Sequence, residues 1–257
     1  MINVRPIRAF NDNYIWLLED GAGQAVVVDP GEADPVSKAL SSRNLTLAGI
    51  LVTHHHFDHT GGVASLASTW ACPVYAPENP AIDAVTQRVS AGDTVDVLGC
   101  RFEVLAVPGH TLDHIAYFRA GEAPLLFCGD TLFAGGCGRV FEGTFPMMFE
   151  SLQRLAALPD ETRVYCAHEY TLANLAFAQA VEPDNAALLE RIAHARELRE
   201  KDKPTVPSLL STERATNPFL RCSQDSVLKG LAAAGRQAGT GRPQDRFAEL
   251  RQWKDSF

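Results

Sequence analysis

The sequence lacks the features of a disulfide-rich, zinc-ribbon or membrane-spanning protein. Its six cysteines are scattered among 257 residues without a Cys-x-x-Cys pair, which argues against disulfides and against structural zinc held by cysteine. No apolar run approaches the ~18 residues of a membrane span, and the amino terminus lacks the basic-then-apolar layout of a signal peptide. These absences predict a protein of the reducing cytoplasm that has no membrane partner.

The chain also lacks an excess of positive charge. Lysine and arginine number 23 against 31 aspartates and glutamates, which gives a formal net charge of −8. This balance argues against a nucleic-acid partner and against an anionic membrane surface. An anionic substrate would therefore need cations placed locally in its site. The length predicts one large domain or one domain with an appendage.

Short apolar runs and helical patterns dominate the first part of the chain. Each run is rich in Val, Ile, Leu and Phe and is broken by Gly, Pro or Asp, which is typical of buried strands that feed loops. Helical patterns lie between some of the runs, roughly at residues 61–70 and 147–158. Mixed strands and helices indicate an α/β fold with helices covering sheets. The runs, each predicted as a buried strand together with the start of the loop that it feeds, are residues 25–31, 48–54, 72–77, 102–110, 114–118, 125–130 and 163–169.

From about Thr171 the sequence becomes helical. A proline-broken connector is expected over residues 201–221, between two pairs of helices. We therefore expect a catalytic domain over residues 1–170 and a helical domain over residues 171–257. The predicted helices of the second domain are residues 171–181, 185–201, 226–235 and 246–257.

Seven of the eight histidines lie just beyond the ends of predicted strands. Open sheets place ligand sites at such strand ends, and half of the histidines fall in one stretch, VTHHHFDHTGG. Local backbone needs do not explain this recurrence, which predicts a binding site. The strand-end histidines are His54, His55, His56, His59, His110, His114 and His168, and Asp130 holds the same position after a further strand.

Imidazole and carboxylate are ligands that borderline divalent metals prefer. Residues two apart in extended chain point the same way, so His54 and His56 can share one metal. Asp58 and His59 come as the chain turns toward a pair of glycines and can face a second ion. A carboxylate from another strand end, Asp130, can bridge both ions. The pattern thus predicts a site for two metals.

Other polar residues near these strand ends have different expected roles. His55 points opposite its neighbours and is expected to be structural or to support a ligand. His114 fits either a supporting role or a hydrogen bond at the start of a strand. Asp29 fits either a residue that orients a ligand histidine or a turn former. His194 lies in the middle of a predicted helix and is expected to be solvated.

The motifs resemble the metallo-β-lactamase superfamily and, within it, the glyoxalase II (hydroxyacylglutathione hydrolase) family. The resemblance rests on THHHFDHTGG, PGHT, GDTLF and AHEYT, together with FNDNYIW, FAGGCGRVFEGT and NPFLR, so it covers nearly the whole chain. It implies a four-layer αββα sandwich followed by a helical domain that helps to hold glutathione.

The resemblance also implies which residues hold two divalent metal ions. Zinc is expected, and iron or manganese would satisfy the same ligands. It places His54, His56 and His110 on one ion and Asp58, His59 and His168 on the other, with Asp130 and a water or hydroxide bridging them.

The family's glutathione-contacting motifs match four positions of this sequence. Arg139, Tyr170 and Arg221 match in type, whereas Phe141 stands where many members carry tyrosine. No lysine closely follows Arg221. Some contacts with the glycine carboxylate of glutathione are therefore expected to be missing or replaced, and the two arginines could instead be ordinary surface cations.

The implied reaction is hydrolysis of S-D-lactoylglutathione and related 2-hydroxyacyl thioesters, a step of methylglyoxal detoxification, by a monomeric cytoplasmic enzyme. A metal-activated water, with its pKa lowered from ~15.7 toward ~7, would attack the thioester carbonyl. Asp58 and Asp130 would act as ligands that position this nucleophile. Cys137 could be a nucleophile instead, but its Gly-rich surroundings favour a tight substrate loop.

Two rival functions are open at this point. A persulfide dioxygenase would share the fold and the histidine cluster but bind one iron, and the long helical region with NPFLR favours the hydrolase. A non-catalytic protein that binds metal or glutathione conjugates would keep the scaffold without an open coordination position. The complete set of seven ligands argues against it.

Overall fold

A computed structural model of the chain describes residues 2–237 and 241–257. Its contacts divide the chain into two compact units. Unit 1 comprises Met1–Ala106 and Asp113–Gly129, and unit 2 comprises Val107–Leu112 and Asp130–Phe257. Within the described ranges, no helix is both long enough and apolar enough to cross a membrane.

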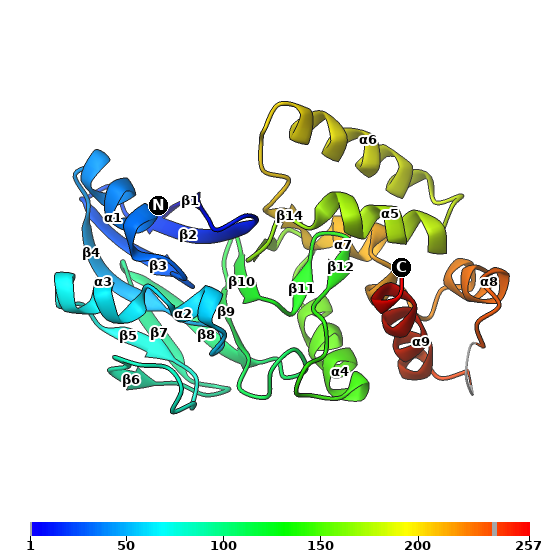
Figure 1. The fold of residues 1–257 in the computed structure, drawn as a ribbon, viewed down its shortest axis with the longest axis horizontal. Helices are drawn as coiled ribbons and strands as arrows, with labels where there is room; N and C mark the ends of the chain where they lie inside the picture. Colours follow the sequence, from blue (N-terminus) through cyan, green and yellow to red (C-terminus); the bar gives the residue numbers. More distant parts are fainter. Residues whose placement is uncertain (1, 238–240) are drawn as a thin grey trace. The chain divides into compact units, whose positions relative to one another are not determined.

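Unit 1 contains a six-stranded sheet whose spatial order follows the chain (Figure 1). Its strands are β1 (Asn3–Ala9), β2 (Asn13–Glu19), β3 (Gln24–Val28), β4 (Thr46–Leu51), β5 (Val74–Ala76) and β6 (Gln87–Arg88). The first three strands are antiparallel, and β3 to β6 are parallel. Parallel neighbours need a crossover connection. Helix α1 (Ala33–Ser42) connects β3 to β4, and α2 (Phe57–Thr60) with α3 (Val63–Trp70) connects β4 to β5.

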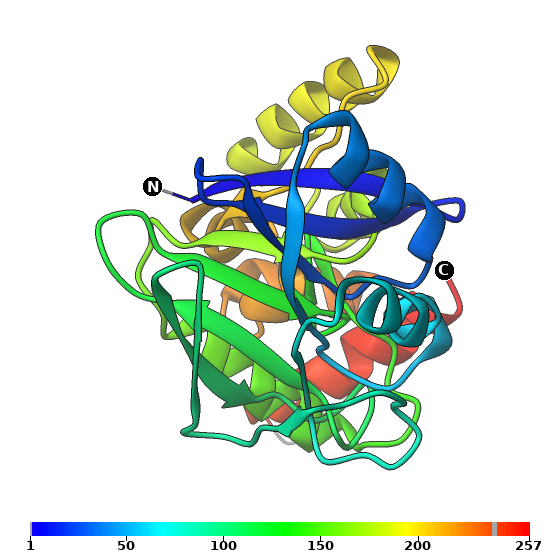
Figure 2. The same ribbon diagram turned by 90° about the vertical axis from the view of Figure 1, so that its left-hand side faces the viewer.

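A second sheet of unit 1 is an antiparallel meander (Figure 2). Its strands are β7 (Thr94–Val97), β8 (Cys100–Ala106), β9 (Ile115–Arg119) and β10 (Leu125–Gly129). Tyr117 of β9 is fully buried and donates its hydroxyl hydrogen bond to the carbonyls of Val52 and Tyr75, at 3.0 and 3.1 Å. These bonds join the second sheet to the carboxyl ends of β4 and β5, where the histidine loop begins.

Unit 2 is mainly helical (Figure 1). Two helices begin at side-chain caps, because Thr144 accepts the Met147 N–H and Asn185 accepts the Leu188 N–H. The elements are the hairpin β11 (Leu132–Phe133) and β12 (Gly136–Cys137), the antiparallel pair β13 (Arg163–Cys166) and β14 (Ser208–Leu209), the helices α4 (Phe145–Ala156), α5 (Thr171–Val181), α6 (Ala186–Glu200), α7 (Leu210–Thr216), α8 (Asp225–Ala233) and α9 (Pro243–Asp255), and the 3₁₀ helix η1 (Pro218–Leu220).

The structure contains the elements expected from sequence and adds several that were not predicted. All seven predicted strands and all six predicted helices overlap observed ones. The proline-broken connector expected over residues 201–221 also contains the short elements β14, α7 and η1, which were not predicted. The hairpin β1–β2, the helices α1 and α2, and the short strands β6, β7, β11 and β12 were also not predicted. Strand β1 is mostly exposed and contains Pro6, so it lacks the apolar alternation by which buried strands are recognised.

Candidate metal centre

The histidine loop of unit 1 leaves the end of β4 and enters the short helix α2. His54 Nε2 lies 3.2 Å from His56 Nδ1. One turn further, His59 Nε2 lies 3.4 Å from Asp58 Oδ2. His54 and His59 are fully buried, whereas the Asp58 side chain is 39% exposed. Unit 1 therefore brings together four of the seven residues expected to bind metal.

Asp29, at the end of β3, orients one of the buried histidines and lies beside another. Its carboxylate accepts hydrogen bonds from the backbone N–H and the hydroxyl of Thr53, both at 2.7 Å, and lies 3.1 Å from His59 Nδ1. Because the Thr53 hydroxyl donates to Asp29, it accepts from His54 Nδ1, 3.1 Å away. His54 Nδ1 thus carries the proton, and its Nε2 keeps the lone pair that binds a metal. His59 Nδ1 lies beside the Asp29 carboxylate without an aligned hydrogen bond. The contact through Thr53 agrees with the orienting role considered for Asp29.

Asn13 is a part of the site that the sequence reading did not single out. Its side-chain amide donates to Asp58 Oδ2 at 3.0 Å, and Asn13 is 7% exposed. It lies at the start of β2, and the five residues that follow it, Tyr14 to Leu18, are aromatic or aliphatic and buried. A buried amide at the end of such a strand is a sequence signal for a hydrogen-bonding role.

Unit 2 brings together the other three expected ligands. Asp130 turns one carboxylate oxygen to each of two imidazoles: Oδ2 lies 3.4 Å from His110 Nε2, and Oδ1 lies 3.3 Å from His168 Nε2. All three residues are buried. His110 Nδ1 lies 2.8 Å from the Arg139 carbonyl, to which it can only donate. Its Nε2 is therefore the atom that can bind a metal.

These separations test whether the donor atoms fit metal ions. Zinc–nitrogen bonds of ~2.0–2.1 Å in tetrahedral geometry place neighbouring donor atoms about 3.3 Å apart. The four separations within the units are 3.2, 3.4, 3.4 and 3.3 Å. Neutral imidazole nitrogens and carboxylate oxygens are also the donor types that zinc, iron and manganese accept. The residues of each unit therefore fit divalent ions in distance and in chemistry.

Three of the four residues expected to bind substrate lie next to ligand histidines of unit 2. The Tyr170 ring stacks on His168, with centroids 4.7 Å apart, and the Phe141 ring meets His110 edge-on at 5.2 Å. Phe141 is 60% exposed and Tyr170 38%. The Arg139 guanidinium lies 5.9 Å from the centre of the Phe141 ring. Two exposed aromatic rings and a cation thus lie beside the imidazoles of unit 2.

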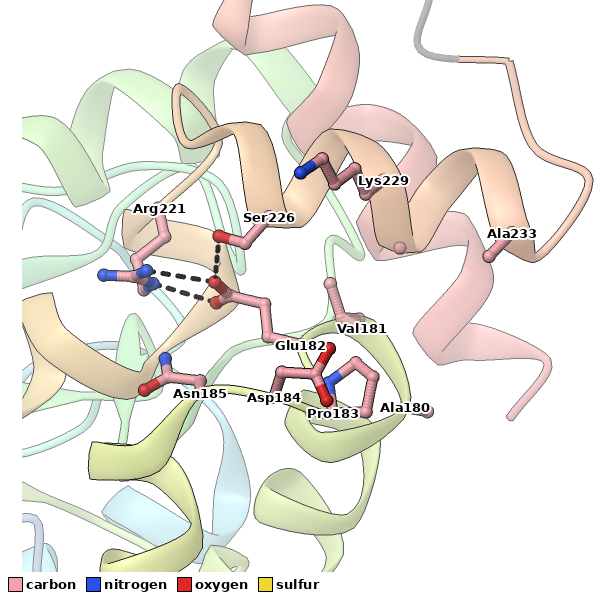
Figure 3. A pocket seen from close by; sticks show the side chains of 11 residues that line it. Ala180, Val181, Glu182, Pro183, Asp184, Asn185, Arg221, Ser226, Lys229 and Ala233 are labelled. Carbon is pink, nitrogen blue, oxygen red and sulfur yellow. Dashed lines mark hydrogen bonds and ion pairs between the residues drawn. The ribbon is translucent and has the colours of Figure 1, made fainter.

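Arg221 lies in a different part of unit 2 (Figure 3). Its guanidinium donates to both carboxylate oxygens of Glu182, at 2.8 and 3.0 Å, and Ser226 donates to the same carboxylate at 2.5 Å. The pair lines a cavity of about 530 Å³ together with Lys229. Tyr170 and Glu182 flank the two ends of α5, so at 1.5 Å per residue they lie about 18 Å apart along its axis. The structure does not bring Arg221 to the ligand histidines, and its substrate contact stays a prediction.

Cys137 is poorly suited to act as a nucleophile. Burial raises the pKa of its thiol, against the opposing effect of the nearby Arg251 guanidinium, and Arg251 also donates to the Cys137 carbonyl at 3.0 Å. The adjacent Gly138 approaches Asp130 so closely that a Cβ would lie 1.9 Å from the Asp130 carbonyl oxygen. Gly138 therefore serves close packing against Asp130. The Cys137 thiol, with its raised pKa, stays protonated.

The sequence matches two known family descriptions that together span most of the chain. Residues 9–168 match the metallo-beta-lactamase superfamily, and residues 169–257 match the hydroxyacylglutathione hydrolase C-terminus. The domain boundary expected after residue 170 stays a prediction, because the two compact units of the structure divide the chain differently.

Relatives and solved structures agree with these matches. The hydroxyacylglutathione hydrolase of Pseudomonas aeruginosa is 56% identical over 260 residues, which cover 100% of both chains. The crystal structure of ETHE1 from Myxococcus xanthus superposes with a TM-score of 0.65 at 25% identity, covering 97% of this chain and 99% of the other. The crystal structure of TTHA1623 in a di-iron-bound form has a TM-score of 0.55 at 31% identity, covering 64% and 91%.

The fold expected from sequence is thereby confirmed as the α/β metallo-β-lactamase sandwich with helices at its carboxyl end. The chain is also an enzyme, as expected, because its full-length relatives are named as hydrolases and it carries histidine–aspartate groups that could hold a metal ion. From its full-length identity to the curated relatives and its two family matches, the chain belongs to the hydroxyacylglutathione hydrolase (glyoxalase II) family of the metallo-β-lactamase superfamily.

Proposed function

We propose that this chain hydrolyses S-D-lactoylglutathione and related 2-hydroxyacyl-glutathione thioesters to glutathione and the free hydroxy acid. The observation that carries the proposal is its 56% identity, over the full length of both chains, to a protein named hydroxyacylglutathione hydrolase. The biological role that follows is methylglyoxal detoxification. A monomeric, cytoplasmic enzyme fits this role, and all six cysteines are free thiols, as expected of a reducing compartment.

The proposal assigns the seven expected ligands to two divalent ions. Zinc is our first choice, and iron or manganese would suit the same donors. Support comes from the separations within each unit and from TTHA1623, a related protein crystallised in a di-iron-bound form. When bound, two such ions would supply water activation near neutral pH and Lewis-acid stabilisation of a developing oxyanion. His54, His56 and His110 would hold one ion and Asp58, His59 and His168 the other, with Asp130 shared.

The chain's own residues prepare these ligands before any metal binds. Through the Thr53 hydroxyl, Asp29 fixes the tautomer of His54, and the Arg139 carbonyl fixes that of His110. Asn13 holds Asp58 in place. Because a hydrogen bond on the far side of the ring already directs the lone pairs of His54 and His110, these two side chains need little reorganisation on binding.

The substrate is proposed to lie against the exposed aromatic residues of unit 2. Phe141 and Tyr170 offer ring surface beside His110 and His168. The Arg139 side chain is 59% exposed and lies 3.4 Å from Asp255, and a carboxylate of glutathione would share or replace this partner. Hydrolysis joins the oxygen of water to the thioester carbonyl carbon and breaks the carbon–sulfur bond. The sulfur leaves as a thiolate with a reference pKa of ~8.5, so no side chain has to protonate it first.

A direct test follows the two products of this bond cleavage. Purified protein is mixed with S-D-lactoylglutathione, and free thiol and lactate are measured together with oxygen consumption. The proposal predicts one thiol and one lactate per thioester consumed and no oxygen uptake. Oxygen uptake with a persulfide substrate, in the absence of thioester cleavage, would instead identify an iron oxygenase.

A further inference from the structure

We infer that Asp113 and Asn79 position the histidine loop of unit 1 through His55. His55 lies between two proposed metal ligands but is not one of them. The inference rests on the proposed function, because positioning of this loop matters to activity only where its neighbours bind metal. It assigns a role to three residues that the proposed chemistry leaves unused.

The central contact joins His55 to Asp113. His55 Nδ1 lies 3.0 Å from Asp113 Oδ1, and the two side chains are 20% and 7% exposed. A carboxylate at this distance accepts the hydrogen bond, so His55 Nδ1 donates it. The bond is shielded by its burial, and it ties the residue between His54 and His56 to a different strand end.

The contact is one of three that pair two short segments in antiparallel order. Residues 113–115 run beside residues 53–55, so each residue of one segment meets one residue of the other. This pairing fixes the loop in register at successive positions. His114 takes both roles considered for it, because its ring stacks on His54 and its Nδ1 donates to the Ile115 carbonyl at the start of β9, at 3.0 Å. The contacts are Asp113 to His55, the His114 ring on the His54 ring with centroids 4.5 Å apart, and the Ile115 N–H to the Thr53 carbonyl at 2.9 Å.

Asn79 holds the second oxygen of Asp113. Its side-chain Nδ2 donates to Asp113 Oδ2 at 2.9 Å, and its Oδ1 accepts the Ala81 N–H at 2.9 Å. The second bond fixes the orientation of the amide, because a flipped amide would set two donors against each other. Arg88 in turn donates to the carbonyls of Pro77, Asn79 and Ile82 at 2.9, 2.6 and 3.2 Å, which closes the loop that carries Asn79.

This pattern of donors and acceptors predicts how substitutions combine. In Asp113→Asn, the new amide can still accept from His55, but its NH₂ then faces the NH₂ of Asn79. In Asn79→Asp, two carboxylates face each other. The double variant N79D/D113N restores every bond. Its amide at position 113 accepts from His55 and donates to the carboxylate at position 79, which still accepts from the Ala81 N–H. Mutation of a residue that orients a metal ligand typically lowers metal affinity 10–100-fold.

The experiment compares wild type, D113N, N79D and N79D/D113N. The control is Asp96→Asn, which removes a carboxylate of unit 1 that pairs with Arg101 on an exposed hairpin. Co²⁺ affinity is measured by competition with a chelator, the visible spectrum of the Co²⁺ protein reports ligand geometry, and thermal unfolding of the metal-free protein reports the fold. If these residues serve the fold alone, the substitutions change thermal unfolding but leave the Co²⁺ affinity and the visible spectrum unchanged.

We expect each single substitution to weaken Co²⁺ binding by about 10–100-fold and to alter the spectrum. The double variant should recover most of the affinity, and D96N should match wild type. Unchanged Co²⁺ affinity in both single variants overturns the inference. A folded double variant that binds Co²⁺ as weakly as the single variants also overturns it. Where a single variant does not fold, a folded double variant that binds Co²⁺ at least 10-fold more weakly than wild type overturns it. A wild-type protein that binds no metal contradicts the proposed function itself, and the inference with it.

Discussion

The Arg221 guanidinium and the Glu182 carboxylate form a bidentate ion pair, with bonds of 2.8 and 3.0 Å, inside the helical part of unit 2. The Glu182 side chain is 1% exposed and that of Arg221 19%. A carboxylate so buried depends on its partner, since an uncompensated charge in the interior is costly. The pair therefore gives Arg221 a structural role beside the substrate contact expected from sequence.

Arg221→Ala is expected to lower the free energy of unfolding by about 3 kcal/mol, because it leaves the Glu182 carboxylate buried without its cation. Urea denaturation measures the loss. The double variant E182A/R221A removes both charges and should recover much of the stability. An R221A protein of wild-type stability with only a raised KM would show instead that Arg221 acts through the substrate.

Asp130→Ala is expected to abolish thioester hydrolysis and to reduce the metal content of the protein. Among the three expected ligands of unit 2, Asp130 is the carboxylate, and it faces both imidazoles, at 3.3 and 3.4 Å, so neither histidine can replace it. Metal analysis and a thioester assay on the same sample check both effects. Glu197→Gln, which removes an exposed carboxylate paired with Lys201, is the control. Near-normal turnover of D130A would disprove the shared-ligand role.

Phe141→Tyr is expected to lower KM and leave kcat unchanged. Phe141 is exposed beside His110, and the added hydroxyl could form one hydrogen bond to bound glutathione, worth about 2- to 10-fold in KM. Phe141→Leu, which loses the ring, should raise KM. If both variants have the wild-type KM, the substrate does not contact this position.

Glu19 provides a test of stability against pH. Burial raises the pKa of its carboxyl, but hydrogen bonds and charges from Arg5 and Arg43 outweigh burial, so the pKa falls below its usual value of 4.5. A lowered pKa in the folded state contributes stability above the unfolded pKa, and this contribution is lost as the pH falls through the folded pKa. Glu19→Gln should therefore be less stable than wild type at pH 7, with a difference that shrinks below about pH 4.5. A difference that does not change with pH would contradict the assignment.

Sequence reasoning found the parts of the structure that repeat a local pattern. The strands that precede His54 and His168 end in buried apolar residues, and the strand that precedes His110 has a buried side, with each ligand within four residues of the strand end. Helix α7 could not be found this way. Its sequence, LSTERAT, is short and polar, and it is stabilised by the buried contact of Glu213 with Arg191, 22 residues earlier in the chain. Local propensity does not report such a contact.

The supporting residues of the site were missed for a related reason. Asn79 lies 34 residues from Asp113, and Asn13 lies 45 residues from Asp58. Each makes one specific hydrogen bond that arises only when distant loops meet. The types of the ligands and their positions after strands are local properties, whereas the bonds that orient them depend on tertiary structure.

The most direct measurement is the metal content of the purified protein, followed with its activity on S-D-lactoylglutathione through removal and return of the metal. Seven donor side chains arranged for two ions predict close to two divalent ions per chain. Activity should fall as a chelator removes them and return when Zn²⁺ is restored. A metal-free protein that still cleaves the thioester at the full rate would contradict the account.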